Sequence, residues 1–182
     1  MEDFAAVVLA GGRSRRLGGV DKLALPTRGG TLLDHTLAAV RGCAPIVVVG
    51  PRRSVAADVR WTREDPPGSG PLAGLSAGLA EVPFARGAVA VLAADHPGIG
   101  PETVARLRRA VIGPGAVLVD DSGRTQWLLG VWRIEELRAA MPGEVRDRPA
   151  RALFGALDPV RVPAVGAEAA DVDTPEDLHR LD

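Results

Sequence analysis

The sequence is poor in the side chains from which metal cages are usually built. Its 182 residues include one cysteine, Cys43, so the chain can form neither an internal disulfide nor a cage of thiolates. The three histidines, His35, His96 and His179, lie far apart and lack the spacing of metal ligands. We therefore expect no zinc site.

Long hydrophobic runs are also missing. No stretch approaches the roughly 18 apolar residues that a membrane-spanning helix needs. The apolar run at residues 4–10 follows Met1-Glu2-Asp3, which lacks the basic flank of a signal peptide. The sequence therefore predicts a cytoplasmic protein with no membrane partner.

The chain has little excess charge of either sign. Its formal net charge is −1, whereas nucleic-acid-binding domains are usually strongly basic, so we expect no nucleic-acid partner. Residues 1–60 nevertheless carry nine Lys and Arg against five Asp and Glu, a local net charge of +4. Arg13, Arg15 and Arg16 fall within four positions, which favours an anionic ligand in this part of the chain.

Aromatic residues make up 3% of the chain and tyrosine is absent, so the core must be built from aliphatic side chains. Apolar runs of strand length alternate with helical patterns, and the runs lack the polar alternation of half-exposed strands. The predicted strands are 4–9, 46–49, a weaker 59–62, 88–93, 116–119 and 128–132. The predicted helices are 31–40, 72–80, 101–111, 134–141 and 150–157, with a short closing helix after Thr174. This order predicts a three-layer α/β/α fold with a mainly parallel sheet, as one domain over residues 1–182.

A glycine-rich segment follows the first predicted strand, at the sheet edge where ligands of such folds bind. Its glycines allow successive main-chain amides to point toward phosphate oxygens, and Ser14, Arg16 and Lys22 add side-chain donors. The segment therefore suits a polyphosphate, although an ordinary glycine-rich turn with a solvated basic face remains an alternative. It is not a Walker loop, because the sequence G-x-x-x-x-G-K-[ST] does not align here. The segment reads Gly11-Gly12-Arg13-Ser14-Arg15-Arg16-Leu17-Gly18-Gly19-Val20-Asp21-Lys22.

A second loop, residues 64–74, follows the weak third strand. Residues 68–73 formally fit the dinucleotide fingerprint G-x-G-x-x-[GA], but two prolines and an acidic pair separate them from the strand, so we interpret the match as chance. A loop that covers a bound base or sugar and a simple helix-entry turn are equally good interpretations.

Two carboxylates are candidate ligands for Mg²⁺. Asp95 follows the apolar strand 88–93 directly, at the sheet's carboxyl edge, although it is also placed to cap a turn before Pro97. Asp173 lies just before the expected closing helix and is a candidate second ligand or, equally, a turn residue.

Together these segments resemble the molybdenum cofactor guanylyltransferase family, within the nucleotidyltransferases that have a Rossmann-like domain of the nucleotide-diphospho-sugar transferase type. The opening motif matches with Leu17 where Met is usual, and the other motifs follow in the family's order over nearly the whole chain. These motifs are Leu9-Ala10-Gly11-Gly12-x-Ser14-x-Arg16-Leu17-Gly18-x-x-x-Lys22, Glu64-Asp65, Gly70-Pro71-Leu72-Ala73-Gly74, Asp95 with Pro97, and Asp173-Thr174-Pro175-Glu176-Asp177-Leu178.

The resemblance implies transfer of GMP from GTP to the phosphate of molybdopterin, with Mg²⁺ as cofactor and molybdoenzyme maturation proteins as candidate partners. It places nucleotide contacts on Leu9, Ala10, Gly11, Lys22, Asp65 and Asp95, and the donors of the glycine-rich segment add Gly12 and Ser14. For this reaction we expect catalytic roles for Arg16, Lys22 and Asp95. Gly11 resembles the guanine-using members, whereas cytidine-using relatives typically have alanine there.

Two departures from the family pattern concern the two substrates. Gly50-Pro51 stands where the guanylyltransferases tend to have Asn near the base, and Gln126-Trp127-Leu128 stands where Gln-Pro-Leu is common. Arg146, Arg148 and Arg151 are candidates for the acceptor phosphate or, alternatively, parts of a solvated face. The alternative activities are a related nucleotidyltransferase using CTP or another phosphorylated acceptor, a silent nucleotide-binding module, and a dinucleotide-dependent oxidoreductase.

Overall fold

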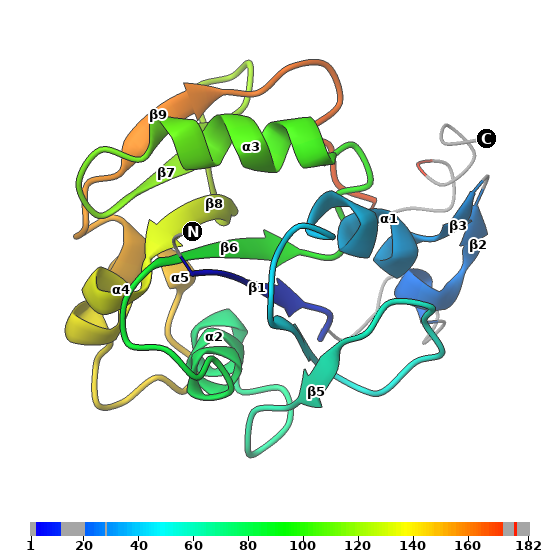
Figure 1. The fold of residues 1–182 in the computed structure, drawn as a ribbon, viewed down its shortest axis with the longest axis horizontal. Helices are drawn as coiled ribbons and strands as arrows, with labels where there is room; N and C mark the ends of the chain where they lie inside the picture. The colour runs from blue at the N-terminus through cyan, green and yellow to red at the C-terminus, as the bar shows by residue number, and fades with distance from the viewer. Residues whose placement is uncertain (1–2, 12–20, 28, 173–176, 178–182) are drawn as a thin grey trace.

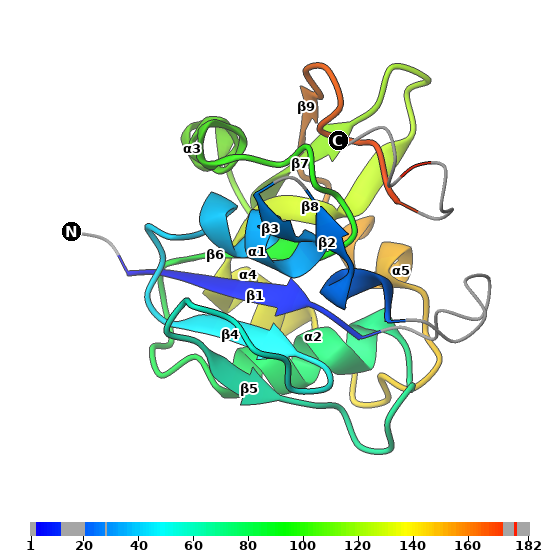
Figure 2. The ribbon, with the colours of Figure 1, turned by 90° about the vertical axis from the view of Figure 1, so that its right-hand side faces the viewer.

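A twisted sheet runs through the centre of the computed structural model, which describes residues 3–11, 21–27, 29–172 and 177 (Figures 1 and 2). Seven strands of the described chain lie side by side in the order β5-β4-β1-β6-β8-β7-β9. The strands are β1 (Phe4–Leu9), β4 (Ile46–Val49), β5 (Arg60–Thr62), β6 (Ala88–Ala93), β7 (Gly115–Val119), β8 (Thr125–Arg133) and β9 (Val160–Pro163). A separate small hairpin joins β2 (Pro26–Thr27) and β3 (Gly30–Thr31).

Strand direction divides the sheet into two parts. β1 pairs in parallel with β4 and β6, and β4 pairs in parallel with β5. β8 runs antiparallel to both of its neighbours, β6 and β7, and β9 returns parallel to β7. The predicted mainly parallel α/β fold is confirmed. β9 was not predicted from the sequence.

Helices cover both faces, and each face has its own hydrophobic core, one of which includes the stacked rings of Trp132 and Phe154. The helices are α1 (Leu32–Ala39), α2 (Pro71–Ala80), α3 (Pro101–Ala110), α4 (Ile134–Ala140) and α5 (Ala150–Phe154), with a 3₁₀ helix η2 (Lys22–Ala24). Because strand side chains alternate between faces, Ala6 and Val8 of β1 pack toward α1 and α3, whereas Ala5 and Val7 pack toward α2, α4 and α5. No helix in the described residues is long and apolar enough to cross a membrane.

Two glycines bring α2 close to the sheet. A Cβ atom on Gly78 would lie 2.5 Å from Val7 Cγ1, which is closer than real side chains approach. One turn earlier, a Cβ on Gly74 would meet Leu9 Cδ2 at 3.4 Å and Val49 Cγ1 at 3.5 Å. The start of α2 therefore lies directly against the ends of β1 and β4.

Candidate nucleotide-binding site

The connections that leave β1 and β6 diverge and open a crevice at the carboxyl end of the sheet. β1 leads through α1 to β4 on one side, whereas β6 leads through α3 toward β7 on the other side, and α1 and α3 lie on the same face. Such a switch point is where open α/β sheets bind their ligands. The glycine-rich segment after β1 and Asp95 after β6 were predicted to meet at this edge.

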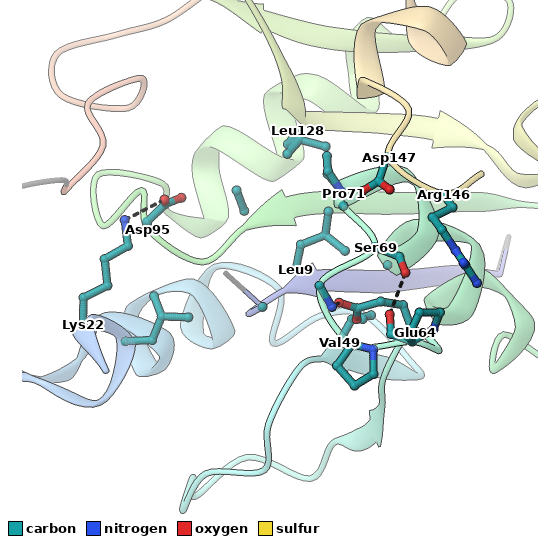
Figure 3. A pocket seen from close by; sticks show the side chains of 18 residues that line it. Leu9, Lys22, Val49, Glu64, Ser69, Pro71, Asp95, Leu128, Arg146 and Asp147 are labelled. Atoms are coloured by element: carbon teal, nitrogen blue, oxygen red, sulfur yellow. Dashed lines mark hydrogen bonds and ion pairs between the residues drawn. The ribbon is translucent and has the colours of Figure 1, made fainter. Parts of the chain in front are cut away.

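A cavity of about 870 Å³ occupies this edge of the sheet. Leu9, Val49 and Ala93, from the ends of three adjacent strands, form part of its wall (Figure 3). The remaining lining residues are Gly11, Lys22, Leu23, Glu64, Pro66, Pro67, Gly68, Ser69, Gly70, Pro71, Gly74, Asp95, Leu128, Arg146 and Asp147. The volume falls in the usual range for small-molecule sites, which is roughly 300–1,000 Å³.

Lys22 and Asp95 meet at one end of the cavity, although 73 positions separate them in the sequence (Figure 3). Lys22 Nζ lies 3.0 Å from Asp95 Oδ2 and donates a second hydrogen bond to the carbonyl of Val172 at 2.8 Å. The Val172 amide donates to the carbonyl of Asp95 at 2.9 Å. Three distant segments therefore converge on one charged contact.

Asp95 is held in its charged form. Burial by itself raises the pKa of this carboxyl group, but the hydrogen bond and charge of His96, followed by those of Lys22, outweigh burial and lower the pKa below its ordinary value. His96 Nδ1 lies 3.0 Å from Asp95 Oδ1. The two neighbours use two of about four acceptor positions on the carboxylate, which leaves lone pairs for another ligand.

The other end of the cavity is formed by the loop before α2 and the loop before α5. Glu64 Oε1 accepts a hydrogen bond from the amide of Gly68 at 2.8 Å, and Ser69 Oγ donates to the carbonyl of Pro66 at 2.6 Å. The Asp147 amide donates to the carbonyl of Ser69 at 2.9 Å, which joins the two loops. Arg146, exposed to solvent, lies next to this junction (Figure 3).

The structure separates the residues predicted to contact the nucleotide into three groups. Leu9, Gly11, Lys22 and Asp95 line the cavity. Ala10 is fully buried, and its amide and carbonyl are engaged with the Val49 carbonyl and Arg53. Asp65 is exposed and does not line the cavity, whereas its neighbours Glu64 and Pro66 do. The predicted residues Gly12, Ser14, Arg16 and Asp173 lie outside the described part of the chain.

The segments that depart from the family pattern lie close to the cavity. Gly50 has φ of +148°, and a Cβ there would lie 2.6 Å from the carbonyl oxygen of Ala10, so the backbone requires glycine. Leu128, from the second departing segment, lines the cavity. Of the three arginines considered for the acceptor phosphate, Arg146 belongs to the lining, while Arg148 and Arg151 do not.

Sequence reasoning missed Val172 and Arg53. The contact of Val172 uses its main chain, for which no sequence signal exists. Arg53 was not singled out from the sequence, yet its side chain is only 11% exposed. Its partner Asp21 lies 32 positions away in the sequence, so no local pattern indicated the pair.

The described residues contain no group of three or more His, Cys, Asp or Glu side chains that would form an all-protein metal cage. Mg²⁺ does not need one, because it is usually held by one or two carboxylates together with substrate phosphates. Asp95, charged and placed at the edge of a cavity, fits that donor set.

Comparisons with known proteins agree with this arrangement. Residues 6–160 match the MobA-like NTP transferase domain. A molybdenum cofactor guanylyltransferase of Acidiphilium cryptum is 37% identical over 71% of this chain and 66% of that protein, just under two thirds of its length. A protein of the same name from Cupriavidus pinatubonensis is 30% identical over 97% of this chain and 95% of that protein.

The fold has solved counterparts as well. A nucleotidyl transferase from Methanothermobacter thermautotroptrophicus superposes with a TM-score of 0.77 over 98% of this chain and 95% of that chain, at 24% identity. The predicted fold class, the family resemblance and the assignment as an enzyme are confirmed. The chain belongs to the family of MobA-like NTP transferase domains and is a nucleotidyltransferase.

Proposed function

We propose that residues 1–182 form one nucleotidyltransferase domain that transfers GMP from GTP to the phosphate of molybdopterin and releases pyrophosphate. The observation that carries the proposal is the contact between Lys22 and Asp95 at the carboxyl edge of β1 and β6. A cation for phosphate oxygens and a carboxylate suited to a divalent ion stand together there. The names of the relatives from Acidiphilium and Cupriavidus support the choice of both substrates.

The reaction requires an oxygen of the acceptor phosphate to attack the α-phosphorus of the nucleotide. The new P–O bond forms as the bond to the bridging oxygen breaks, and pyrophosphate leaves with the electron pair. Bringing two anions together is the main obstacle, so positioning and charge neutralisation carry most of the catalysis. The acceptor is already an anion, so the site needs no general base.

We assign the phosphate end of the cavity to Lys22 and Asp95. The ammonium of Lys22 would bind the triphosphate, together with the predicted amides and side chains of the glycine-rich segment. Asp95 would hold Mg²⁺, which when bound supplies positive charge to the phosphate oxygens. Arg146, at the opposite end of the cavity, supports an acceptor phosphate there.

A panel of ligands tests the nucleotide. The melting temperature of the protein would be measured with GTP, CTP and ATP, each with and without Mg²⁺. A ligand at about 100 times its Kd stabilises the folded state by roughly 2.7 kcal/mol. We expect GTP with Mg²⁺ to raise the melting temperature. If CTP raises it and GTP does not, CTP and not GTP is the nucleotide donor. NAD serves as the control for the oxidoreductase alternative.

Pyrophosphate release with molybdopterin as acceptor tests the reaction. Asp95→Asn should lower turnover by orders of magnitude, and Lys22→Ala should weaken nucleotide binding, since each removes a charge that the phosphates require. Asp58→Asn is the matched control, because Asp58 is exposed and stands outside the cavity lining. Near-normal turnover in Asp95→Asn would refute the assignment. The cytoplasmic location and the maturation partners stay predictions from the sequence.

A further inference from the structure

Arg53, in the loop after β4, makes an unusually complete set of hydrogen bonds. Its Nε and Nη2 donate to the two carboxylate oxygens of Asp21, at 2.7 and 2.9 Å. Its Nη1 donates to the carbonyls of Ala10 at 3.0 Å and Pro51 at 3.1 Å. With a side chain only 11% exposed, Arg53 is fixed by four contacts to three separate segments.

Two partners of Arg53, Ala10 and Asp21, lie on either side of the glycine-rich residues 11–20 in the sequence. Ala10 directly follows β1, and Asp21 directly precedes η2, so residues 11–20 lie between them in the sequence. Arg53 therefore fixes the point where the chain leaves β1 and the point where it enters η2. A planar guanidinium binds both oxygens of a carboxylate through two parallel donors in a fixed geometry while another nitrogen donates to a carbonyl, whereas the ammonium of lysine is a point charge without that fixed geometry.

Asp21 passes this constraint on to Lys22. The Asp21 carboxylate caps η2 by accepting a hydrogen bond from the Leu23 amide at 3.3 Å. The Arg53 hydrogen bond lowers the pKa of Asp21 despite an opposing effect of burial, so the cap stays charged at neutral pH. Lys22, the first residue of η2, starts from this cap and reaches Asp95.

We infer that Arg53 is a positioning residue of the nucleotide site, which ties both ends of the glycine-rich segment to the loop after β4 and, through Asp21, sets the place of Lys22. The inference rests on the proposed function. Arg53 also donates to Pro51 in its own loop, so one side chain joins the loop after β4 to the end of β1 and the start of η2.

The test compares Arg53→Ala, Arg53→Lys and Asp21→Asn with the unaltered protein. Arg138→Ala is the matched control, because Arg138 also donates to main-chain carbonyls, those of Leu79, Val82 and Phe84, but stands outside the cavity lining. The free energy of unfolding, the KM for GTP, the KM for the acceptor and kcat would be measured for each variant under conditions where circular dichroism shows it folded.

We expect Arg53→Ala to raise the KM for GTP by about 10- to 100-fold, the range in which small misplacements act, and to leave the acceptor KM unchanged. Arg53→Lys should give a smaller rise in the KM for GTP, because lysine keeps the positive charge but lacks the paired donors of the guanidinium. The double variant of Arg53→Ala with Asp21→Asn should be little worse than Arg53→Ala alone, since the two residues act as one unit. Arg138→Ala should lower stability and leave the KM for GTP unchanged.

An unchanged KM for GTP in Arg53→Ala would overturn the inference and leave the proposed function standing. An equal rise in Arg138→Ala would also overturn it, because general loosening of the fold would then explain the effect. If Arg53→Ala fails to fold, the comparison of Arg53→Lys with Arg138→Ala decides in the same way. If the unaltered protein itself fails to bind any nucleoside triphosphate, the proposed function falls, and this inference falls with it.

Discussion

Replacing Glu168 with glutamine should destabilise the protein from a position outside the cavity lining. Glu168 is 8% exposed and lies in the loop after β9. Its Oε1 accepts from Thr103 Oγ1 at 2.6 Å and Arg106 Nη1 at 3.1 Å, and its Oε2 accepts from the Val165 amide at 2.8 Å and from Arg106 Nη2. These contacts fasten the loop to α3.

The magnitude follows from what a glutamine can accept. Its oxygen can keep the Val165 amide and one Arg106 nitrogen, and the Thr103 hydroxyl can turn to accept from its NH₂ group. The other Arg106 nitrogen then faces a donor, and the ion pair loses its negative charge. Hydrogen bonds to charged groups contribute about 1.5–3 kcal/mol each. We expect a loss of about 2–3 kcal/mol, or roughly 4–12 °C in Tm for a chain of this size.

The loss should also depend on pH. Burial raises the pKa of Glu168, but hydrogen bonds from Arg106, Thr103 and the Val165 amide outweigh it, so the folded-state pKa lies below its ordinary value. The charged form therefore stabilises the fold fully above the unfolded-state pKa of about 4.3, and this contribution is lost as the pH falls through the lower folded-state pKa.

Urea unfolding of the natural protein and Glu168→Gln, at pH 7 and at steps below pH 5, measures both effects. The difference in unfolding free energy should be full at pH 7 and shrink toward acid pH. Glu102→Gln is the control, because Glu102 is exposed in the first turn of the same helix and should change stability by no more than about 0.5 kcal/mol. A Glu168→Gln protein as stable as the control, or a difference that does not shrink in acid, would refute the reasoning.

Two further predictions concern α2 and the charged contact. Gly78→Ala should destabilise the fold by about 1 kcal/mol, because the cost of overpacking against Val7 exceeds the gain in helix propensity. Gly74→Ala should be neutral or stabilising by up to about 1 kcal/mol, because its new methyl group has room. Urea unfolding measures both variants, and a Gly78→Ala protein more stable than Gly74→Ala would contradict this prediction. Asp95→Asn should lower the unfolding free energy by about 1–3 kcal/mol at pH 7, because the charged contacts with His96 and Lys22 are lost. Since the pKa of Asp95 is lowered on folding, the difference in unfolding free energy between the unaltered protein and Asp95→Asn should shrink as the pH falls below about 4. A difference that does not change with pH would count against a stabilising role for the charged Asp95 carboxylate.

The buried strands were predictable because their sequences are continuous apolar runs. β1, β4 and β6 have the predicted bounds. β9 was missed because Val160–Pro163 alternates apolar and polar residues at the edge of the sheet. The antiparallel direction of β8 has no local signal, because a run of residues such as Leu128 to Trp132 reads the same in either direction. The predicted helix 150–157 ends at Phe154, before Gly155.

At the site, the sequence predicted which strand ends converge and left open which atoms meet. Lys22 and Asp95 were chosen as separate motif residues, and their contact follows from the switch point between β1 and β6. Asp65 was predicted as a nucleotide contact, whereas Glu64 lines the cavity, because the turn of the loop, which has no signal in the sequence, decides which side chain faces it. Arg53 was missed because its partners are far away in the sequence.

The way Val172 is joined to the site affects which changes evolution can accept there. Both of its hydrogen bonds, from Lys22 Nζ and to the Asp95 carbonyl, use main-chain atoms that every amino acid except proline possesses. Replacing the side chain leaves these two bonds available, whereas inserting or deleting one residue between the Glu168 anchor and Val172 would bring a different peptide group to Lys22. Because the Val172 side chain is buried in the core, this position should stay apolar among relatives, and the stretch from Glu168 to Val172 should keep its length.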